Sequence, residues 1–100
     1  MAQLLSDDQV RTALLGLDDW DGDTTVIRRT AVLPTFPAAI DVVRQVAEVA
    51  EELDHHPDID IRWRTLHFAC STHSDNGVTG KDTDLAARID AIVSSVTANG

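Results

Sequence analysis

The spacing of the apolar residues changes twice in the second half of the chain, and this restricts the fold more than any other feature. Apolar residues recur every three or four positions in 40–53 and again in 85–96, which predicts two amphipathic helices. Between them, in 59–70, the apolar residues alternate, which predicts strands with one buried face. Helical stripes and a one-sided sheet bury the same core, so the sequence predicts an α+β fold with helices gathered on one face of an antiparallel sheet.

The first third of the chain predicts a short helix and a hairpin. Residues 6–9 read Ser-Asp-Asp-Gln, a capping-box pattern that starts a helix over 7–16. Gly16 stands at the end of this helix, where a left-handed residue is often needed. Turn residues follow Trp20, and a run rich in β-branched side chains follows at 24–33. This pattern predicts a hairpin whose first strand is short and centred near Trp20.

Capping signals set the boundaries of the two long helices. Residues 35–37 read Thr-Phe-Pro and open the second helix, because proline is tolerated in a first helical turn. That helix must stop by His56, since Pro57 disfavours helical geometry in the residue before it. Residues 79–82 read Thr-Gly-Lys-Asp, a second capping-box candidate that opens the last helix.

The extended segment between these helices carries one irregularity. Its alternation runs from residue 58 to residue 73 but shifts phase at 64–65, which indicates a bend, a bulge or a break. The chain therefore reads helix, two strands, helix, one long or two short strands, helix. Its length of 100 residues suits one domain over 1–100.

Charge and composition narrow the classes of partner. Seventeen acidic against eight basic residues leave a formal charge of −9, which argues against nucleic acid or an anionic membrane as partner. The single cysteine, Cys70, cannot form an intrachain disulfide, so packing alone must hold the fold. No apolar run reaches the roughly 20 residues of a membrane span. The first residues lack the pattern of a signal peptide, so we expect a cytoplasmic protein.

Three groups of polar residues stand at the ends of predicted elements. They are 54–57 (Asp-His-His-Pro), 71–73 (Ser-Thr-His) and Asp82. Side chains at element ends can converge on one cleft. Histidines titrate near neutral pH and can both give and take protons, and a carboxylate such as Asp82 or Asp54 would fix the tautomer of a ring. The pattern favours general acid–base chemistry.

Two other kinds of site fit less well. Three histidines and an aspartate could form a zinc set, but the chain has neither His-x-x-x-His nor Cys-x-x-Cys spacing. A Cys–His nucleophile would need an exposed thiol, whereas Cys70 is in phase with Leu66 and Phe68 and points at the core. His67 lies in the middle of a predicted strand, where a structural or exposed role is expected.

The same residues resemble a known family, the pterin-4a-carbinolamine dehydratases. The resemblance rests on an acid at Glu51, His-His-Pro at 55–57, an aromatic at Trp63, His73 and Asp82, in that register. It covers roughly residues 15–90, and the further residues that match are Trp20, Ile27, Arg29, Phe36, Ala47, Gly77, Val78, Thr79 and Lys81.

The resemblance implies three helices packed on one face of a four-stranded antiparallel sheet, in the order α-β-β-α-β-β-α. It implies dehydration of 4a-hydroxytetrahydropterin to quinonoid dihydropterin, without metal or cofactor. His55 and His73 would be the acid–base pair, His56 would chiefly hold the pterin, and Asp82 would orient the histidines. Which histidine is acid and which is base stays open. The residues expected to bind substrate are Asp54, His55, His56, Ser71, Thr72, His73 and Ser74.

The resemblance also bears on partners. A homodimer or homotetramer is expected, because the strand edges and the sheet face opposite the helices need cover. An aromatic amino acid hydroxylase is a candidate partner, since the reaction recycles the pterin that such enzymes use. The alternative from another class is a non-catalytic pterin-binding protein, or a dimerisation or stabilising partner of another protein.

Overall fold

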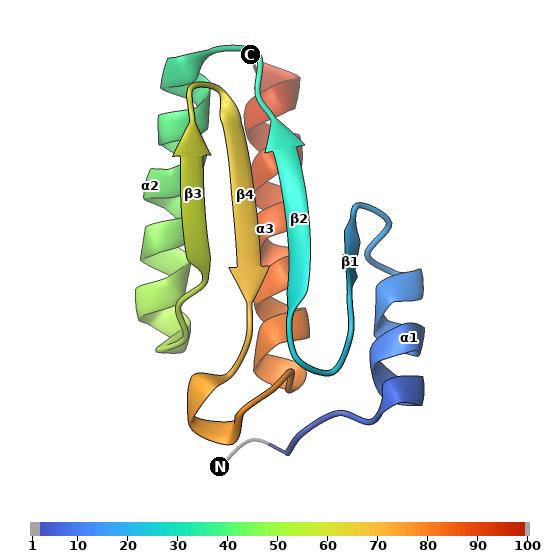
Figure 1. The fold of residues 1–100 in the computed structure, drawn as a ribbon. Coiled ribbons are helices and arrows are strands. Elements are labelled where there is room, and N and C mark those ends of the chain that lie inside the picture. The colour runs from blue at the N-terminus through green and yellow to red at the C-terminus, as the bar shows by residue number, and fades with distance from the viewer. Residues whose placement is uncertain (1–2, 100) are drawn as a thin grey trace.

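A computed structural model describes residues 3–99 and contains the predicted elements in the predicted order. These are α1 (Asp7–Leu15), β1 (Trp20–Gly22), β2 (Ile27–Val32), α2 (Phe36–Leu53), β3 (Asp58–Arg62), β4 (Thr65–Cys70), the 3₁₀ turn η1 (His73–Asp75) and α3 (Gly80–Asn99). The four strands form one antiparallel sheet in the order β1-β2-β4-β3 (Figure 1). The fold class is therefore confirmed.

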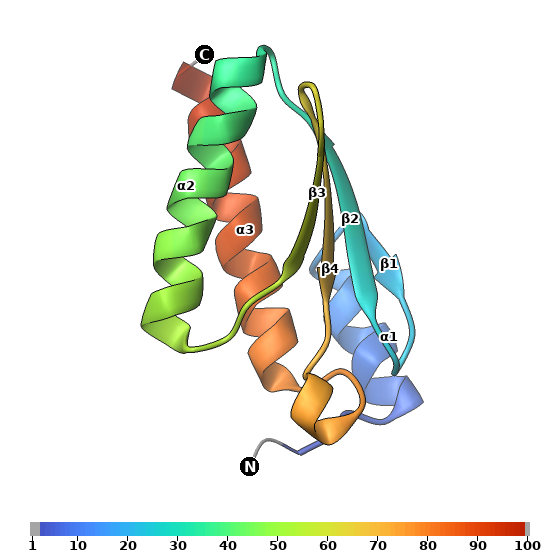
Figure 2. The same ribbon diagram turned by 60° about the vertical axis from the view of Figure 1, so that its left-hand side comes forward.

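The helices and the sheet form two layers around one core. Helices α2 and α3 pack against each other and cover one face of the sheet, while α1 lies beside β1 (Figures 1 and 2). Alternate residues of β4 point into the core, as the spacing predicted, and are almost fully buried: Leu66, Phe68 and Cys70. Val10 of α1 joins the same core. Among the described residues, no helix is long and apolar enough to cross a membrane.

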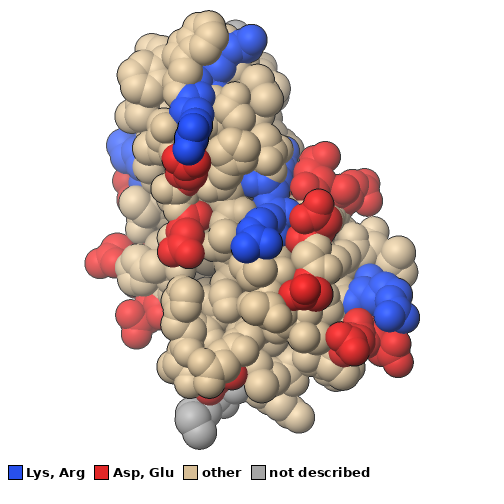
Figure 3. All heavy atoms as spheres, in the orientation of Figure 1, with Lys and Arg blue, Asp and Glu red and all other residues tan. Residues whose placement is uncertain are grey.

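Among the described residues, no helix covers the opposite face of the sheet, which carries charged side chains of both signs (Figure 3). This face is made by the residues of β2, β3 and β4 that alternate with the buried ones. The pattern follows from the sequence, because a sheet with one buried face presents its other set of side chains to solvent.

A polar cluster fastens the sheet to α3. Arg29 points from β2 toward the helical layer, and its Nη1 lies 2.5 Å from Oδ1 of Asp90. The indole nitrogen of Trp20 donates to the same oxygen at 2.8 Å. The Arg29 side chain is only 12% exposed, so its charge needs this partner. The cluster joins β1, β2 and α3 on the side of the core away from α2.

The expected left-handed residue at the end of α1 is not found. Gly16 follows α1 with φ −95°, not in the left-handed region. The N–H of Gly16 donates to the carbonyl of Ala13, three residues earlier. The last turn of α1 therefore closes with a 3₁₀-type hydrogen bond and needs no residue with positive φ. The left-handed helix end belongs instead to Asp54, with φ 51°, at the C-terminus of α2.

The segment after α2 forms two short strands, with a tight turn at 63–64 in place of one long strand. The second strand is shorter than the sequence predicted, because β4 ends at Cys70 and His73 lies in η1. The strand ends here because the backbone N–H of Thr72 donates a hydrogen bond to the carbonyl of Gly77 at 2.8 Å. The chain therefore leaves the sheet just before the histidine.

Candidate active site

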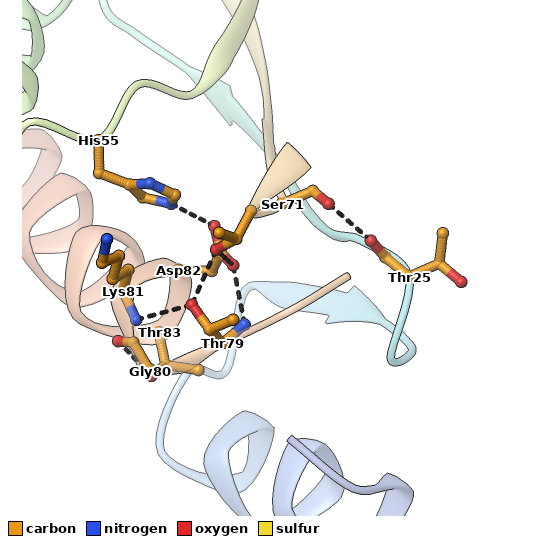
Figure 4. A network of polar contacts seen from close by, with 9 residues as sticks. Thr25, His55, Ser71, Thr79, Gly80, Lys81, Asp82 and Thr83 are labelled. Atoms are coloured by element: carbon orange, nitrogen blue, oxygen red, sulfur yellow. Dashed lines mark hydrogen bonds and ion pairs between the residues drawn. The ribbon is translucent and has the colours of Figure 1, made fainter. Parts of the chain in front are cut away.

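Asp82 is the centre of the candidate site, and its position follows from the start of α3. It lies in the first helical turn and is fully buried, with 0% of its surface exposed. The backbone N–H of Thr79, the residue before the helix, donates to Oδ2 at 2.9 Å (Figure 4). The hydroxyl of Thr72 donates to the same oxygen at 2.8 Å. A carboxylate is favoured at this end of a helix by both the free N–H groups and the helix dipole.

The hydroxyls around Asp82 form a chain with a fixed direction. An ionised carboxylate only accepts hydrogen bonds, so the single hydroxyl proton of Thr72 is donated to Asp82. The hydroxyl of Thr79, 2.7 Å from that of Thr72, must then donate to Thr72. Thr79 in turn accepts from the backbone N–H of Lys81 at 3.2 Å. Each hydroxyl proton therefore has one acceptor, and this chain of hydrogen bonds holds the Asp82 carboxylate in one orientation.

His55 completes this network from the other side. Its Nε2 lies 2.6 Å from Oδ1 of Asp82, and its side chain is 10% exposed. Because the carboxylate accepts, Nε2 carries the proton and Nδ1 is the nitrogen left to accept one. The left-handed Asp54 turns the chain out of α2, and the backbone N–H of His55 donates back to the carbonyl of Ala50 at 3.0 Å. The end of α2 thus fixes the position of the ring.

His56 has a different environment. Its Nε2 lies 2.5 Å from Oε2 of Glu51, and the side chains are 57% and 77% exposed. Exposed pairs of this kind add little stability, because water screens them and each side chain loses freedom. The pair therefore holds the His56 ring at the surface beside the end of α2, without burying it.

His73 and Ser71 line a cavity at the end of β4. The cavity has a volume of about 390 Å³, within the range of small-molecule sites. His73 is exposed in η1, and the Ser71 hydroxyl donates to the carbonyl of Thr25 at 2.9 Å (Figure 4). The polar residues of its wall are Thr25, Arg28, Asp58, Ser71, His73 and Asn76.

The structure thus divides the residues predicted for the site. Thr72, Asp82 and His55 share one network, whereas Ser71 and His73 share a cavity. Within residues 3–99, no hydrogen bond joins His55 to His73, and the side chains of Asp54 and Ser74 take part in none.

Thr79 is the residue that sequence reasoning missed. The Thr-Gly-Lys-Asp pattern identified it only as the start of a helix, although its hydroxyl belongs to the network around Asp82. The same pattern carried the signal, because a capping box brings the acid at its third helical position back to the capping residue.

The residues considered for other chemistries lie elsewhere. His67 is on the outer sheet face, where its Nδ1 lies 2.9 Å from the hydroxyl of Thr30. In the part of the chain that the structure describes, no three His, Cys, Asp or Glu side chains are grouped so that they could hold a metal ion. Cys70 is buried, and burial, with a smaller contribution from Asp82, raises the pKa of its thiol to about 12. This disfavours the thiolate that a nucleophile needs.

We predict that Thr72→Val lowers the free energy of unfolding by about 1–3 kcal/mol, because it removes a hydroxyl donor from a buried carboxylate. Thr72→Ser is the matched control: it keeps the hydroxyl and is expected to cost clearly less. Urea unfolding of the three proteins measures both effects. Equal losses for the valine and serine variants would contradict the hydrogen-bond assignment.

The buried thiol predicts a loss of stability at alkaline pH. The pKa of Cys70 is near 9.0 in an unfolded chain and about 12 in the folded one. Its contribution to stability is therefore complete below pH 9 and is lost as the pH rises toward 12, by up to about 1.4 kcal/mol per unit. The chain has no tyrosine and a single lysine, so few other groups titrate there. Unfolding curves from pH 8 to 11 should slope for the wild type and flatten for Cys70→Ala; parallel curves would refute the assignment.

Sequence comparison identifies relatives along most of the chain. The family model described as pterin 4 alpha carbinolamine dehydratase matches residues 3–92. A protein of Nocardia farcinica, provisionally named pterin-4-alpha-carbinolamine dehydratase, is 56% identical over 90 residues, which cover 90% of this chain and 95% of that protein. A protein of Mycolicibacterium smegmatis with the same provisional name is 53% identical over 91 residues, covering 91% and 97%.

Solved structures agree with this relationship. The crystal structure described as a transcriptional coactivator/pterin dehydratase from Brucella melitensis matches with a TM-score of 0.88 and 32% identity, over 91% of this chain and 99% of that one. A pterin dehydratase-like protein, described as a RuBisCO assembly factor in the alpha-carboxysome, has a TM-score of 0.63 at 16% identity, over 74% and 86% of the two chains, and shares the fold alone. This chain belongs to the pterin 4 alpha carbinolamine dehydratase family.

Proposed function

We propose that this protein converts 4a-hydroxytetrahydropterin to quinonoid dihydropterin and water by histidine acid–base catalysis, in the recycling of tetrahydropterin. The observation that carries the proposal is the contact between His55 and the buried Asp82, in a chain of this family. A buried carboxylate that fixes the tautomer of a ring at an element end is an arrangement suited to proton transfer.

The reaction needs two proton transfers and no electron acceptor. The bond between C4a and the hydroxyl oxygen breaks, and the oxygen takes up a proton and leaves as water. The ring nitrogen bonded to C4a loses its proton, and its electron pair forms the new double bond to C4a. Hydroxide is a poor leaving group, so a protonated group must act as the bond breaks, while another group accepts the nitrogen's proton.

His55 and His73 are proposed to be the proton acceptor and the proton donor of this reaction. In the neutral ring of His55 the proton is on Nε2, so Nδ1 is free to accept the proton from the pterin nitrogen. Asp82 then stabilises the charged ring that results. His73, exposed at the cavity wall, is proposed to deliver the proton to the leaving hydroxyl. His56, at the surface beside Glu51, is proposed to hold the pterin, with Asp54, Ser71, Thr72 and Ser74 as further substrate-binding residues.

A second candidate function is that of a non-catalytic partner that binds or stabilises another protein. Apolar side chains on the surface favour some assembly, and those exposed near the β3–β4 turn and the start of α2 are Val32, Phe36, Ile40, Ile61 and Trp63. Within residues 3–99, no strand pairs with the outer edge of β3. We propose that a homodimer or homotetramer covers part of this surface, and that an aromatic amino acid hydroxylase is a candidate partner.

The test is a dehydratase assay on 4a-hydroxytetrahydropterin generated in situ, after treatment with a chelator. We expect the wild type to exceed the uncatalysed rate, and His55→Ala, His73→Ala and Asp82→Asn to lose about 10²- to 10⁴-fold in kcat. Asp84→Asn is the matched control, because this exposed carboxylate lies two residues along the same helix and should leave the rate unchanged. A folded wild type that merely matches the uncatalysed rate would overturn the proposal in favour of the non-catalytic function.

A further inference from the structure

The turn between β1 and β2, residues 23–26, lies against the cavity that contains His73. The carbonyl of Thr25 accepts a hydrogen bond from the hydroxyl of Ser71 at 2.9 Å (Figure 4). Thr25 and Val26 also line this cavity, together with Ser71 and His73. The turn therefore borders the part of the site in which His73 is proposed to deliver its proton.

The same turn also holds the loop that leads to Asp82. The carbonyl of Thr24 accepts from the backbone N–H of Val78 at 2.8 Å. Val78 is fully buried and directly precedes Thr79, whose N–H donates to Oδ2 of Asp82. The turn and the loop approach closely, because a Cβ at Gly77 would lie 2.7 Å from the carbonyl oxygen of Thr24. Two successive carbonyls of this turn thus contact both groups of site residues.

Asp23 fixes the shape of the turn. Its Oδ1 accepts from the backbone N–H of Thr25 at 2.8 Å and from that of Val26 at 3.4 Å. Its own backbone N–H donates to the carbonyl of Val26 at 3.0 Å. An aspartate that accepts from the backbone two residues ahead forms an Asx turn. The N–H of Thr25, and then that of Val26, lowers the pKa of the Asp23 carboxyl, so these bonds are made to a charged acceptor at neutral pH.

Resting on the function proposed above, we infer that Asp23 is a positioning residue, which through the β1–β2 turn holds the Asp82 network in its place relative to His73. Asp23 is exposed and is not among the residues that line the His73 cavity, so its carboxylate acts through the backbone of the turn. In the proposed mechanism His55, held by Asp82, and His73 must both reach one pterin ring. A displacement of about 1 Å between such groups can cost about 10²-fold in rate.

The test compares Asp23→Ala, which removes the acceptor, with Asp23→Asn, whose side-chain carbonyl can form the same turn. In the dehydratase assay we expect Asp23→Ala to lower kcat by about 10-fold while KM stays within about threefold, because the placement of proton donor and acceptor counts in the transition state. Asp23→Asn should stay within about twofold of the wild-type kcat, since the turn is kept.

Asp21→Ala is the matched control. Asp21 is an exposed carboxylate two residues earlier, in β1, and within residues 3–99 its side chain takes part in no hydrogen bond or ion pair. This variant should keep the wild-type kcat and KM.

Hydrogen exchange gives a second measurement that does not depend on turnover. The amide of Val78 donates to Thr24 and the amide of Thr79 donates to Asp82, so both report on the contact between turn and loop. We expect Asp23→Ala to raise both exchange rates by about 10-fold, the effect of losing about one hydrogen bond. Asp23→Asn and Asp21→Ala should keep the wild-type rates.

A wild-type kcat in Asp23→Ala, or unchanged exchange at Val78 and Thr79, would overturn the inference while leaving the dehydratase function standing. A loss in Asp23→Asn or in Asp21→Ala as large as that in Asp23→Ala would overturn it as well, because the turn formed by the Asp23 side chain would then not be the cause. A wild type that merely matches the uncatalysed rate would overturn the proposed function and the inference with it.

Discussion

The burial of the Asp82 carboxylate is the constraint on which the site depends. A charge taken out of water costs several kcal/mol unless donors surround it, so each donor must be held in place. The donors come from three separate segments: Thr79 at the start of α3, Thr72 just after β4, and His55 just after α2. One carboxylate thus ties together the ends of both layers. Removing any one donor would disturb the packing of the other two.

The same constraint explains how a small domain can present a histidine with a defined proton. The hydroxyl chain from Thr79 through Thr72 leaves Oδ1 of Asp82 for His55 alone. The ring is therefore oriented by the fold itself, and orientation accounts for a large part of the rate that an enzyme gains from proton transfer. In the proposed mechanism, the stability of the fold and the proton transfer by His55 depend on the same few hydrogen bonds.

Much of the architecture could be predicted because it follows from the spacing of apolar residues and from capping residues that lie close together in the sequence. The alternation of Leu66, Phe68 and Cys70 gave the buried face of β4, and the Thr-Gly-Lys-Asp run gave the start of α3. Contacts between distant segments could not be predicted in this way. The bond between Thr72 and Asp82 joins a strand end to a helix start, and the contact between Arg29 and Asp90 joins β2 to α3. The turn at η1 was missed because a backbone bond, with no pattern of its own, ends the strand.

The central claim is that Asp82 holds His55 with its proton on Nε2, and NMR tests it most directly. Long-range ¹H–¹⁵N correlation spectra of protein labelled with ¹⁵N-histidine distinguish the two neutral tautomers of each ring. At a pH where the rings are neutral, the account predicts the Nε2–H tautomer for His55 in the wild type, and loss of this preference in Asp82→Asn. A His55 ring that carries its proton on Nδ1 in the wild type would contradict the account.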